Sequence, residues 1–132
     1  MTVRENTRSW RCVATLELFS LLVEEYDPAI DFFTRVLGFE LVEDSPSLTN
    51  DGRAKRWVVV RPKGGQTGIL LAQADGPEQR AGIGNQFFGR VGLFYRVEDF
   101  GAAYERMVRL GVEFLGEPRD EPYGRIVVFK DL

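Results

Sequence analysis

One pattern of residues occurs twice in this chain, and the duplication constrains the fold more than any single motif. The first copy runs from Val23 through an amphipathic segment to Gly38, and the second runs from Val97 through a similar segment to Gly111. The second copy follows the first by 74 residues at its start and by 73 at its end. A repeat of this length is a whole supersecondary unit. The sequence therefore predicts two similar modules in tandem.

Length, charge and cysteine content bound the class of protein. The 132 residues suffice for one domain with a buried core, and the net charge of −3 disfavours nucleic acid or an anionic membrane as a partner. Cys12 is the only cysteine, which excludes a disulfide within the chain and favours a reducing compartment. Residues 1–12 lack the apolar core of a signal peptide. We therefore expect a cytoplasmic protein that binds neither nucleic acid nor membranes.

The sequence contains no histidine, and this absence narrows the possible chemistry. Histidine is the commonest general base near neutral pH and the commonest zinc or iron ligand. Nucleophilic schemes that need Ser-His-Asp or Cys-His are excluded. Any proton transfer would depend on Asp, Glu, Tyr, Lys or the single cysteine.

Hydrophobic periodicity predicts the element order β-α-β-β-β, a connector, and then β-α-β-β. Asp27 and Pro28 favour the start of the first helix and Gly38 its end, while Asp99 and Gly111 mark the second helix in the same way. The predicted strands cover residues 13–23, 39–43, 56–61 and 67–73 in the first copy and residues 90–97, 112–115 and 124–130 in the second, with polar turns at 45–52 and 117–123.

These elements predict the domain organisation. An N-terminal arm at residues 1–12 precedes a single domain at residues 13–132. The domain consists of a first module at residues 13–73 and a second at residues 90–132, joined by a polar, Gly-rich connector at residues 74–89. The second module has one strand fewer, because the sequence ends where an eighth strand is expected. We expect its sheet to keep an open edge, which another chain can cover.

Several runs of residues carry a resemblance to a known family. They are Tyr26-Asp27-Pro28-Ala29-Ile30-Asp31-Phe32-Phe33 and Val36-Leu37-Gly38-Phe39-Glu40-Leu41 in the first half, and Val97-Glu98-Asp99-Phe100, Leu110-Gly111-Val112 and Pro122-Tyr123-Gly124-Arg125 in the second. In order, spacing and duplication they resemble the vicinal oxygen chelate superfamily, which includes glyoxalases, bleomycin-resistance proteins and extradiol dioxygenases. The resemblance covers residues 13–132. It implies an α+β fold of tandem βαβββ modules, here with the second module lacking its last strand, around a cavity that a homodimer often completes.

The resemblance also implies where a divalent metal would bind, and the sequence lacks suitable donors there. The first-strand ligand positions of the two modules fall on Leu18 and Gly92, and the fourth-strand candidates are Leu70, Leu71 and Gln73. The remaining position would lie beyond the end of the sequence. Aliphatic side chains and glycine have no atom that coordinates a metal ion. We therefore predict no metal site and no cofactor.

Strand alternation predicts which side chains face the cavity. Leu18 and Ser20 would face it from the first module, and Phe94 and Arg96 from the second. The guanidinium of Arg96 would clamp a carboxylate or phosphate, or it would extend to solvent. Trp57 and Phe94 would line an aromatic pocket for a flat ligand, or they would belong to the ordinary core.

Two further residues complete the candidate ligand site, and two acidic pairs have another explanation. Gln73 at a strand end would orient a ligand or end in solvent, and Tyr123 would reach over the cavity mouth or pack on the sheet. Glu24-Glu25 and Glu98-Asp99 stand at strand-to-helix junctions. Acids are favoured at helix N-termini, so we interpret both pairs as helix caps.

Three functions remain open from the sequence. The first is a small-molecule-binding protein without the usual metal centre. The second is a metal-dependent lyase or dioxygenase of the same superfamily whose ligands are atypical or supplied by a partner. The third is a protein-interaction module that uses the open sheet edge.

Overall fold

The computed structural model describes residues 14–132, so the predicted N-terminal arm and Cys12 lie outside the described part. In chain order the elements are β1 (Leu18–Val23), α1 (Tyr26–Asp31), the π-helical turn η1 (Phe32–Val36), β2 (Glu40–Leu48), β3 (Ala54–Arg61), β4 (Gly68–Gln73), α2 (Gly76–Gly82), α3 (Phe100–Arg109), β5 (Arg119–Glu121) and β6 (Gly124–Ile126). The mixed α+β class expected from the sequence is confirmed.

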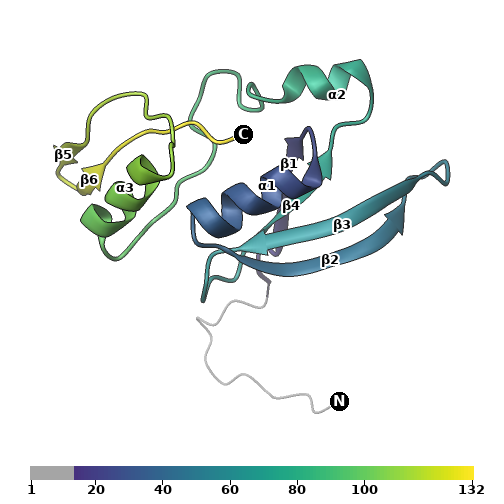
Figure 1. Ribbon diagram of the computed structural model, residues 1–132, viewed down its shortest axis with the longest axis horizontal. Helices are drawn as coiled ribbons and strands as arrows, with labels where there is room; N and C mark the ends of the chain where they lie inside the picture. Colours follow the sequence, from purple (N-terminus) through teal and green to yellow (C-terminus); the bar gives the residue numbers. More distant parts are fainter. Residues whose placement is uncertain (1–13) are drawn as a thin grey trace, which may run out of the picture.

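The first module forms a four-stranded sheet in the order β1-β4-β3-β2 (Figure 1). α1 and η1 carry the chain from β1 at one edge to β2 at the other, and β2, β3 and β4 follow as antiparallel neighbours. β4 pairs in parallel with β1, so that Leu18 lies opposite Gly68 and Val23 opposite Gln73. The βαβββ order predicted for this module is confirmed.

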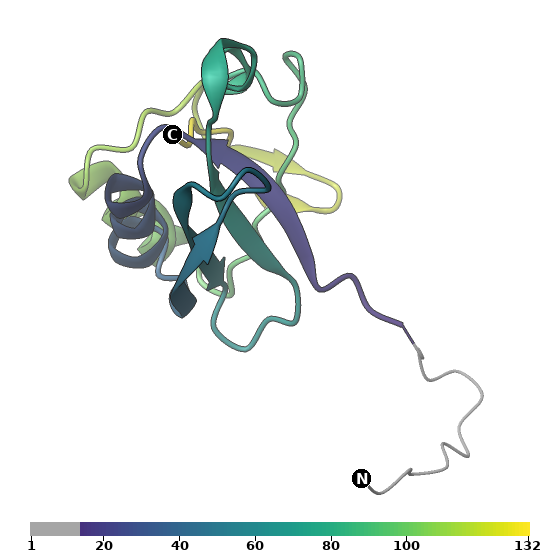
Figure 2. The same cartoon turned by 90° about the vertical axis from the view of Figure 1, so that its right-hand side faces the viewer.

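One face of the sheet packs against α1 and η1 and forms the core. Leu21, Val58 and Leu71 project from three neighbouring strands toward Ala29 and Phe33, and all five are at most 1% exposed. The ring of Phe33 also contacts its aromatic neighbours Phe32 and Phe39. Figure 2 shows that α3 lies on the same side of the sheet as α1. The core is therefore one-sided, and it leaves the opposite face of the sheet without a covering helix along most of its length.

An arginine on β3 connects the start of α1 to two strands. Arg56 donates to Asp27 of α1 at 2.8 Å and to Asp44 of β2 at 2.6 Å, and its guanidinium lies 5.1 Å from the centre of the Tyr26 ring. Our prediction that Asp27 caps the helix is wrong, because α1 already begins at Tyr26. Glu25 occupies the cap position but makes no side-chain cap bond, so the interpretation of Glu24-Glu25 as a capping pair is wrong as well. The carboxylate of Asp27 is used for the ion pair instead.

β2 is longer than the sequence suggested. We predicted a strand at 39–43 and a turn at 45–52, but β2 continues to Leu48 and pairs with β3 as far as Ala54. Pro46 lies within this extension. Proline is compatible with an edge strand because its missing N–H can face away from the sheet, and β2 is an edge strand.

The second half of the chain does not repeat the sheet. Residues 90–97, predicted as a strand, form neither a strand nor a helix in the described part of the chain. A strand is defined by pairing with a neighbour, so the predicted strand is wrong for a single copy. The strands predicted at 112–115 and 124–130 are shorter than expected. The first is present only as a single bridge between Phe114 and Phe129, and the second only as β6.

Two elements of the second half were not predicted. β5 lies within the turn expected at 117–123 and pairs with β6 to form a short hairpin. α2 lies within the connector, where Pro77 occupies the first turn and the side chain of Gln79 accepts from the backbone N–H of Asp75 at 2.8 Å. This proline and glutamine were the available signal for a helix start.

α3 follows the sequence prediction closely. The carboxylate of Asp99 accepts from the backbone N–H of Ala102 at 3.0 Å, so the predicted cap is confirmed. Gly111 follows the helix with a positive φ of 83°. Met107 joins the core formed by the first module, and Arg106 donates to the backbone carbonyl of Arg35. Among residues 14–132, no helix is long and apolar enough to cross a membrane.

Truncating a buried side chain of this core should lower the free energy of unfolding far more than truncating an exposed leucine. Leu71→Ala removes a side chain with 0% exposure, and we expect a loss of about 2–5 kcal/mol in the free energy of unfolding. Leu48→Ala is the matched control on another strand, at 63% exposure, and should change it by about 0.5 kcal/mol or less. Urea unfolding followed by circular dichroism measures both. Equal losses would contradict this assignment of the core.

Candidate ligand site on the open face of the sheet

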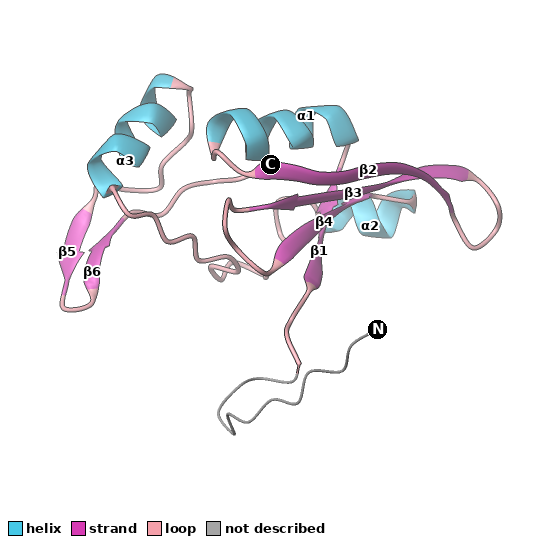
Figure 3. Ribbon diagram, turned by 90° about the horizontal axis from the view of Figure 1, so that it is seen from below, coloured by secondary structure: helices cyan, strands magenta, loops and turns pink. Residues whose placement is uncertain are grey.

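The face of the sheet opposite α1 contains a hollow of about 200 Å³. Figure 3 shows α1 and α3 on the other side of the strands. We call this hollow the open-face site. It is lined by Glu17, Leu18, Val42, Glu43, Trp57, Val59, Arg61, Gln66 and Gly68. Its floor is therefore apolar and its margin carries charged groups.

The alternation of β3 produces the floor of the site. Val58 and Val60 point into the core, so Trp57, Val59 and Arg61 point to the open face. Gly68 on β4 allows the side chains of Leu18 and Val59 to pack closely over it, because a Cβ at this position would lie 3.0 Å from atoms of both. That separation is too short for a side chain to be accommodated without displacing its neighbours.

An irregularity in β2 adds two consecutive residues to the site. The register of β2 against β3 shifts between Leu41 and Glu43, so that Val42 has no partner on β3. This is the geometry of a β-bulge, which bends the strand and redirects a side chain. Val42 and Glu43 therefore both line the hollow, although neighbours in a regular strand point to opposite faces.

The charges at the margin are unevenly paired. Arg61 donates to Glu40 at 3.0 Å, whereas its buried Nε–H has no hydrogen-bond partner. Glu43 accepts from the hydroxyl of Ser45 at 3.1 Å. Among residues 14–132, neither Glu17 nor Glu43 has an ion-pair partner. The site therefore combines a neutralised guanidinium with two uncompensated carboxylates.

α2 and the following loop cover one end of the open face. The side-chain amide of Gln86 accepts from the backbone N–H of Leu22 at 2.7 Å and donates to its carbonyl at 2.9 Å. It thereby imitates a neighbouring strand at the edge of β1. A Cβ on Gly82 would lie 3.1 Å from the Leu22 side chain. The open-face site lies toward the other end of β1, beside Leu18.

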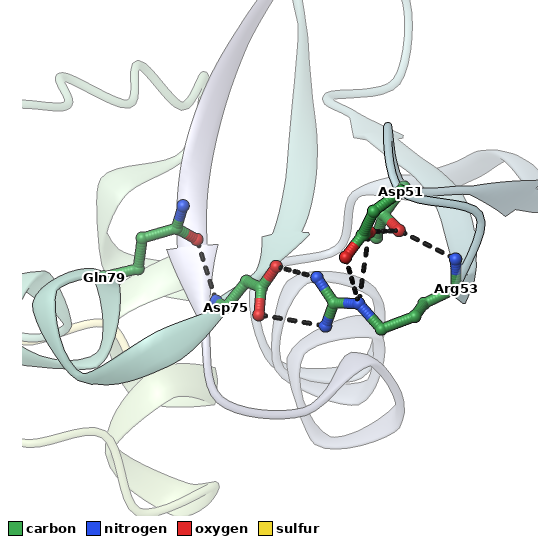
Figure 4. A network of polar contacts seen from close by, with 5 residues as sticks. Asp51, Arg53, Asp75 and Gln79 are labelled. Carbon is green, nitrogen blue, oxygen red and sulfur yellow. Dashed lines mark hydrogen bonds and ion pairs between the residues drawn. The ribbon is translucent and has the colours of Figure 1, made fainter.

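A polar network fixes the start of α2 to the β2–β3 loop (Figure 4). Arg53 donates to Asp75 at 2.6 and 3.2 Å and to Asp51 at 3.0 Å. The hydrogen bonds and charge of Arg53 lower the pKa of the Asp75 carboxyl below its usual 3.8. Since the backbone N–H of Asp75 also donates to the side-chain oxygen of Gln79, the network positions the helix that closes one end of the open face.

A second hollow, of about 210 Å³, lies where α3 meets η1. Its lining is Val36, Leu37, Tyr95, Ala102, Ala103, Arg106 and Met107. The Tyr95 hydroxyl donates to the carbonyl of Leu37 at 2.9 Å, and burial raises the pKa of Tyr95. Most of the lining is apolar, and its one phenol already has a partner. We interpret it as a packing gap between the two halves of the chain.

The structure brings together some of the residues predicted for the site. Leu18 and Trp57 both line the open-face site, and Ser20 lies exposed two residues along β1 from Leu18. Gln73 lies at the end of β4, where its amide donates to the carbonyl of Glu24 at 3.2 Å.

Three predicted residues lie on the second half, away from the hollow of this copy. Phe94 and Arg96 are exposed within residues 90–97, and Tyr123 is exposed in the β5–β6 turn. The sequence analysis missed Val59 and Arg61, although alternation from Trp57 along the same strand was an available signal. The contribution of Val42 depends on the bulge, which no local pattern of residues indicates.

The residues at the family's metal positions do not fit a divalent metal. Leu18 and the β4 residues Leu70 and Leu71 have no donor atoms, and a Cβ on Gly92 would lie 2.0 Å from the ring of Phe87. Within residues 14–132, no group of three or more acidic, histidine or cysteine side chains could hold a metal ion.

The whole described chain matches one protein family. Residues 15–132 match the model of the Glyoxalase/Bleomycin resistance protein/Dioxygenase superfamily, and the chain belongs to this superfamily. An uncharacterized protein of Shewanella frigidimarina is 46% identical over 114 residues, which cover 86% of this chain and 82% of that protein. The protein YetH of Bacillus subtilis is 33% identical over 85% of each chain.

Solved structures show the same fold. UcmS2 is 30% identical with a TM-score of 0.72, over 91% of this chain and 92% of UcmS2. TnmS3, described as an antibiotic binding protein from Streptomyces sp. CB03234, is 31% identical with a TM-score of 0.70, over 92% of this chain and 89% of TnmS3. The family expected from the sequence is confirmed.

The Asp75–Arg53 pair should stabilise the protein only where Asp75 is ionised. Its folded pKa is lowered, so its contribution is present above the unfolded pKa and is lost as the pH falls through the folded value. We expect Asp75→Asn to lower the melting temperature slightly at neutral pH and to have no effect at a pH well below 3.8. Asp120→Asn is the control. Asp120 lies 3.7 Å from Arg125, a longer contact than that of Asp75 with Arg53, so its loss should change the melting temperature little at either pH. A difference that persists in acid would contradict the ion-pair account.

Proposed function

We propose that the protein binds a small, flat, largely apolar molecule on the open face of its first-module sheet. The observation that carries the proposal is the open-face site, in which Trp57, Leu18 and Val59 form an apolar floor beside a few polar groups. Ligand sites are mostly apolar with a small number of polar anchors. The aromatic face of Trp57 supplies a large contact area for a flat ligand.

A second copy of the chain is needed to enclose such a ligand. The hollow measures about 200 Å³, below the roughly 300–1,000 Å³ of ligand pockets. Phe88, Phe94 and Tyr123 of the second half are 86%, 88% and 75% exposed, and exposed apolar residues of this size mark interaction surfaces. We infer a homodimer in which residues 90–97 and the β5–β6 hairpin of one copy lie over the open face of the other. Phe94, Arg96 and Tyr123 would then reach the site from the partner.

The relatives support an antibiotic-like ligand. TnmS3 is described as an antibiotic binding protein and covers nearly the whole chain at 31% identity. Binding without chemistry needs only shape and a few anchors, which agrees with the lack of metal donors at Leu18 and Gly92. We therefore favour sequestration of an aromatic antibiotic over a metal-dependent reaction.

Trp57 allows ligand binding to be measured directly. In a Trp10→Phe background Trp57 is the only tryptophan, and a bound aromatic antibiotic should quench its fluorescence in a saturable way. We expect a panel of aromatic antibiotics to contain at least one such ligand. Calorimetry on the otherwise unchanged chain should then show at least about tenfold weaker binding for Trp57→Ala, from the loss of one stacking contact.

The control for that measurement is Phe100→Ala. Phe100 stacks on Tyr104 within α3 and lies outside the open-face site, so its removal should leave the affinity for the same antibiotic unchanged. Failure of the whole panel to quench Trp57, or equal affinities for Trp57→Ala and the unchanged chain, would overturn the proposal.

A single substitution that introduces a charge at the proposed interface tests the dimer. Sedimentation should give twice the chain mass of 15.0 kDa, and Phe94→Glu should shift the equilibrium strongly toward the monomer, because an unpaired carboxylate would be buried at the interface. Leu48→Glu at the far end of β2 is the control and should remain dimeric. A wild-type chain that sediments as a monomer would contradict the proposal.

A further inference from the structure

One side chain takes the place of a neighbouring strand at the outer edge of β1. On the inner side, the carbonyl of Glu17 accepts from the backbone N–H of Gly68 at 2.8 Å, so the odd-numbered residues of β1 bond to β4. The backbone groups of the even-numbered residues therefore point outward. At Leu22 both outward groups bond to the side-chain amide of Gln86, at 2.7 and 2.9 Å. This end of the edge is closed.

The other end of the same edge is open. The outward backbone groups of Leu18 and Ser20 meet no strand among residues 14–132, because β1 is the last strand of its sheet. The side chain of Ser20 is exposed. A row of unpaired N–H and C=O groups is a template for a strand of another chain. The edge therefore has room for a short added strand at Leu18 and Ser20.

Residues 90–97 have the pattern of a strand but cannot reach this edge in their own copy. Leu93 packs on the core, and the ring of Tyr95 lies 5.1 Å from that of Phe39. Phe39 directly precedes β2, which forms the opposite edge of the sheet from β1. Phe94, between the two anchored residues, is 88% exposed. A strand that completes β1 with this segment therefore comes from a second copy.

Charge complementarity indicates the direction of such a strand. Glu17 precedes β1 and lines the open-face site, and Arg96 is exposed near the end of residues 90–97. Neither has an ion-pair partner in the described part of the chain. Gln86 closes the edge at Leu22, so the arginine has room only at the Glu17 end. A strand that carries Arg96 to this end runs antiparallel to β1.

We propose that residues 90–97 of a second copy add to the open edge of β1 as an antiparallel strand. Phe94 of the partner then lies opposite Ser20 and exchanges two backbone hydrogen bonds with it, and Arg96 lies opposite Leu18, beside Glu17. Residues directly opposite each other share a face of the sheet, so Phe94 and Arg96 point to the open face. This inference rests on the proposed homodimer and names the contacts that hold it together.

Amide hydrogen exchange measured by NMR tests the backbone pairing. In the wild-type dimer the Ser20 amide should exchange at least about tenfold more slowly than in Phe94→Glu, the variant expected to be monomeric, because only the dimer gives it an acceptor. The amides of Leu21 and Leu22 are the internal controls. Leu21 is directed to β4 and Leu22 donates to Gln86, so both should stay protected in either sample.

A charge exchange tests the direction of the strand. Arg96→Glu and Glu17→Arg should each weaken the dimer by roughly fivefold in sedimentation equilibrium, because each replaces an attraction by a repulsion. The two together should restore most of the affinity. Arg90→Glu with Glu17→Arg is the matched control, since Arg90 would lie beside Glu17 only in a parallel arrangement, and it should restore none.

The outcomes separate this inference from the proposed function. A wild-type dimer whose Ser20 amide exchanges as fast as that of Phe94→Glu overturns the added strand, while the dimer and its ligand site stand. Rescue of Glu17→Arg by Arg90→Glu instead of Arg96→Glu overturns the antiparallel strand. A wild-type monomer overturns both the strand and the proposed dimer, and quenching of Trp57 by an antibiotic then decides separately whether the ligand site exists.

Discussion

The packing of α1 and η1 against one face of a four-stranded sheet is the interaction on which the rest of the structure depends. Phe33 and Ala29 meet Leu21, Val58 and Leu71 in a region that excludes water almost completely. Because successive strand residues alternate between faces, burying these side chains necessarily presents their neighbours on the other side. The open-face site is thus a direct consequence of the core packing, because the choice of the buried face decides which side chains line the site.

The same constraint leaves apolar side chains of both halves of the chain uncovered. A sheet with one buried face is stable when the other face is solvated or covered, and here the other face carries Trp57, Val59 and Leu18. The second half contributes Met107 to the shared core but leaves Phe94 and Tyr123 exposed. An apolar open face and an apolar unpaired segment in one chain are complementary surfaces. The homodimer that we propose would cover both.

Local signals predicted the first module well. The patterns in residues 56–61 and 67–73 and the glycine at position 38 were enough to predict β3, β4 and the end of the first helix, and the duplication led to the family. The cap at Asp99 was predicted correctly because it depends on the next three residues. The cap at Asp27 was not, since Arg56 is distant in sequence and takes that carboxylate.

The features that the sequence did not predict depend on contacts between residues far apart in the chain. The bulge at Val42 arises from the register between β2 and β3, and residues 90–97 form no strand within residues 14–132 although their own pattern predicts one. For the site, alternation placed Leu18 toward the cavity, and the aromatic ring of Trp57 suggested a pocket. The ion pair of Arg61, in contrast, depends on Glu40 across the strand pair. Pairing between distant residues decides these features, and periodicity within one segment does not report it.

We propose that the open face of one copy is covered by the second half of another. A sample that mixes isotope-labelled and unlabelled chains allows NMR contacts between copies to be observed selectively. The account predicts nuclear Overhauser effects between the Phe94 ring of one copy and the Trp57 or Leu18 side chain of the other. Contacts restricted to single chains, with Trp57 accessible to a soluble quencher, would contradict it.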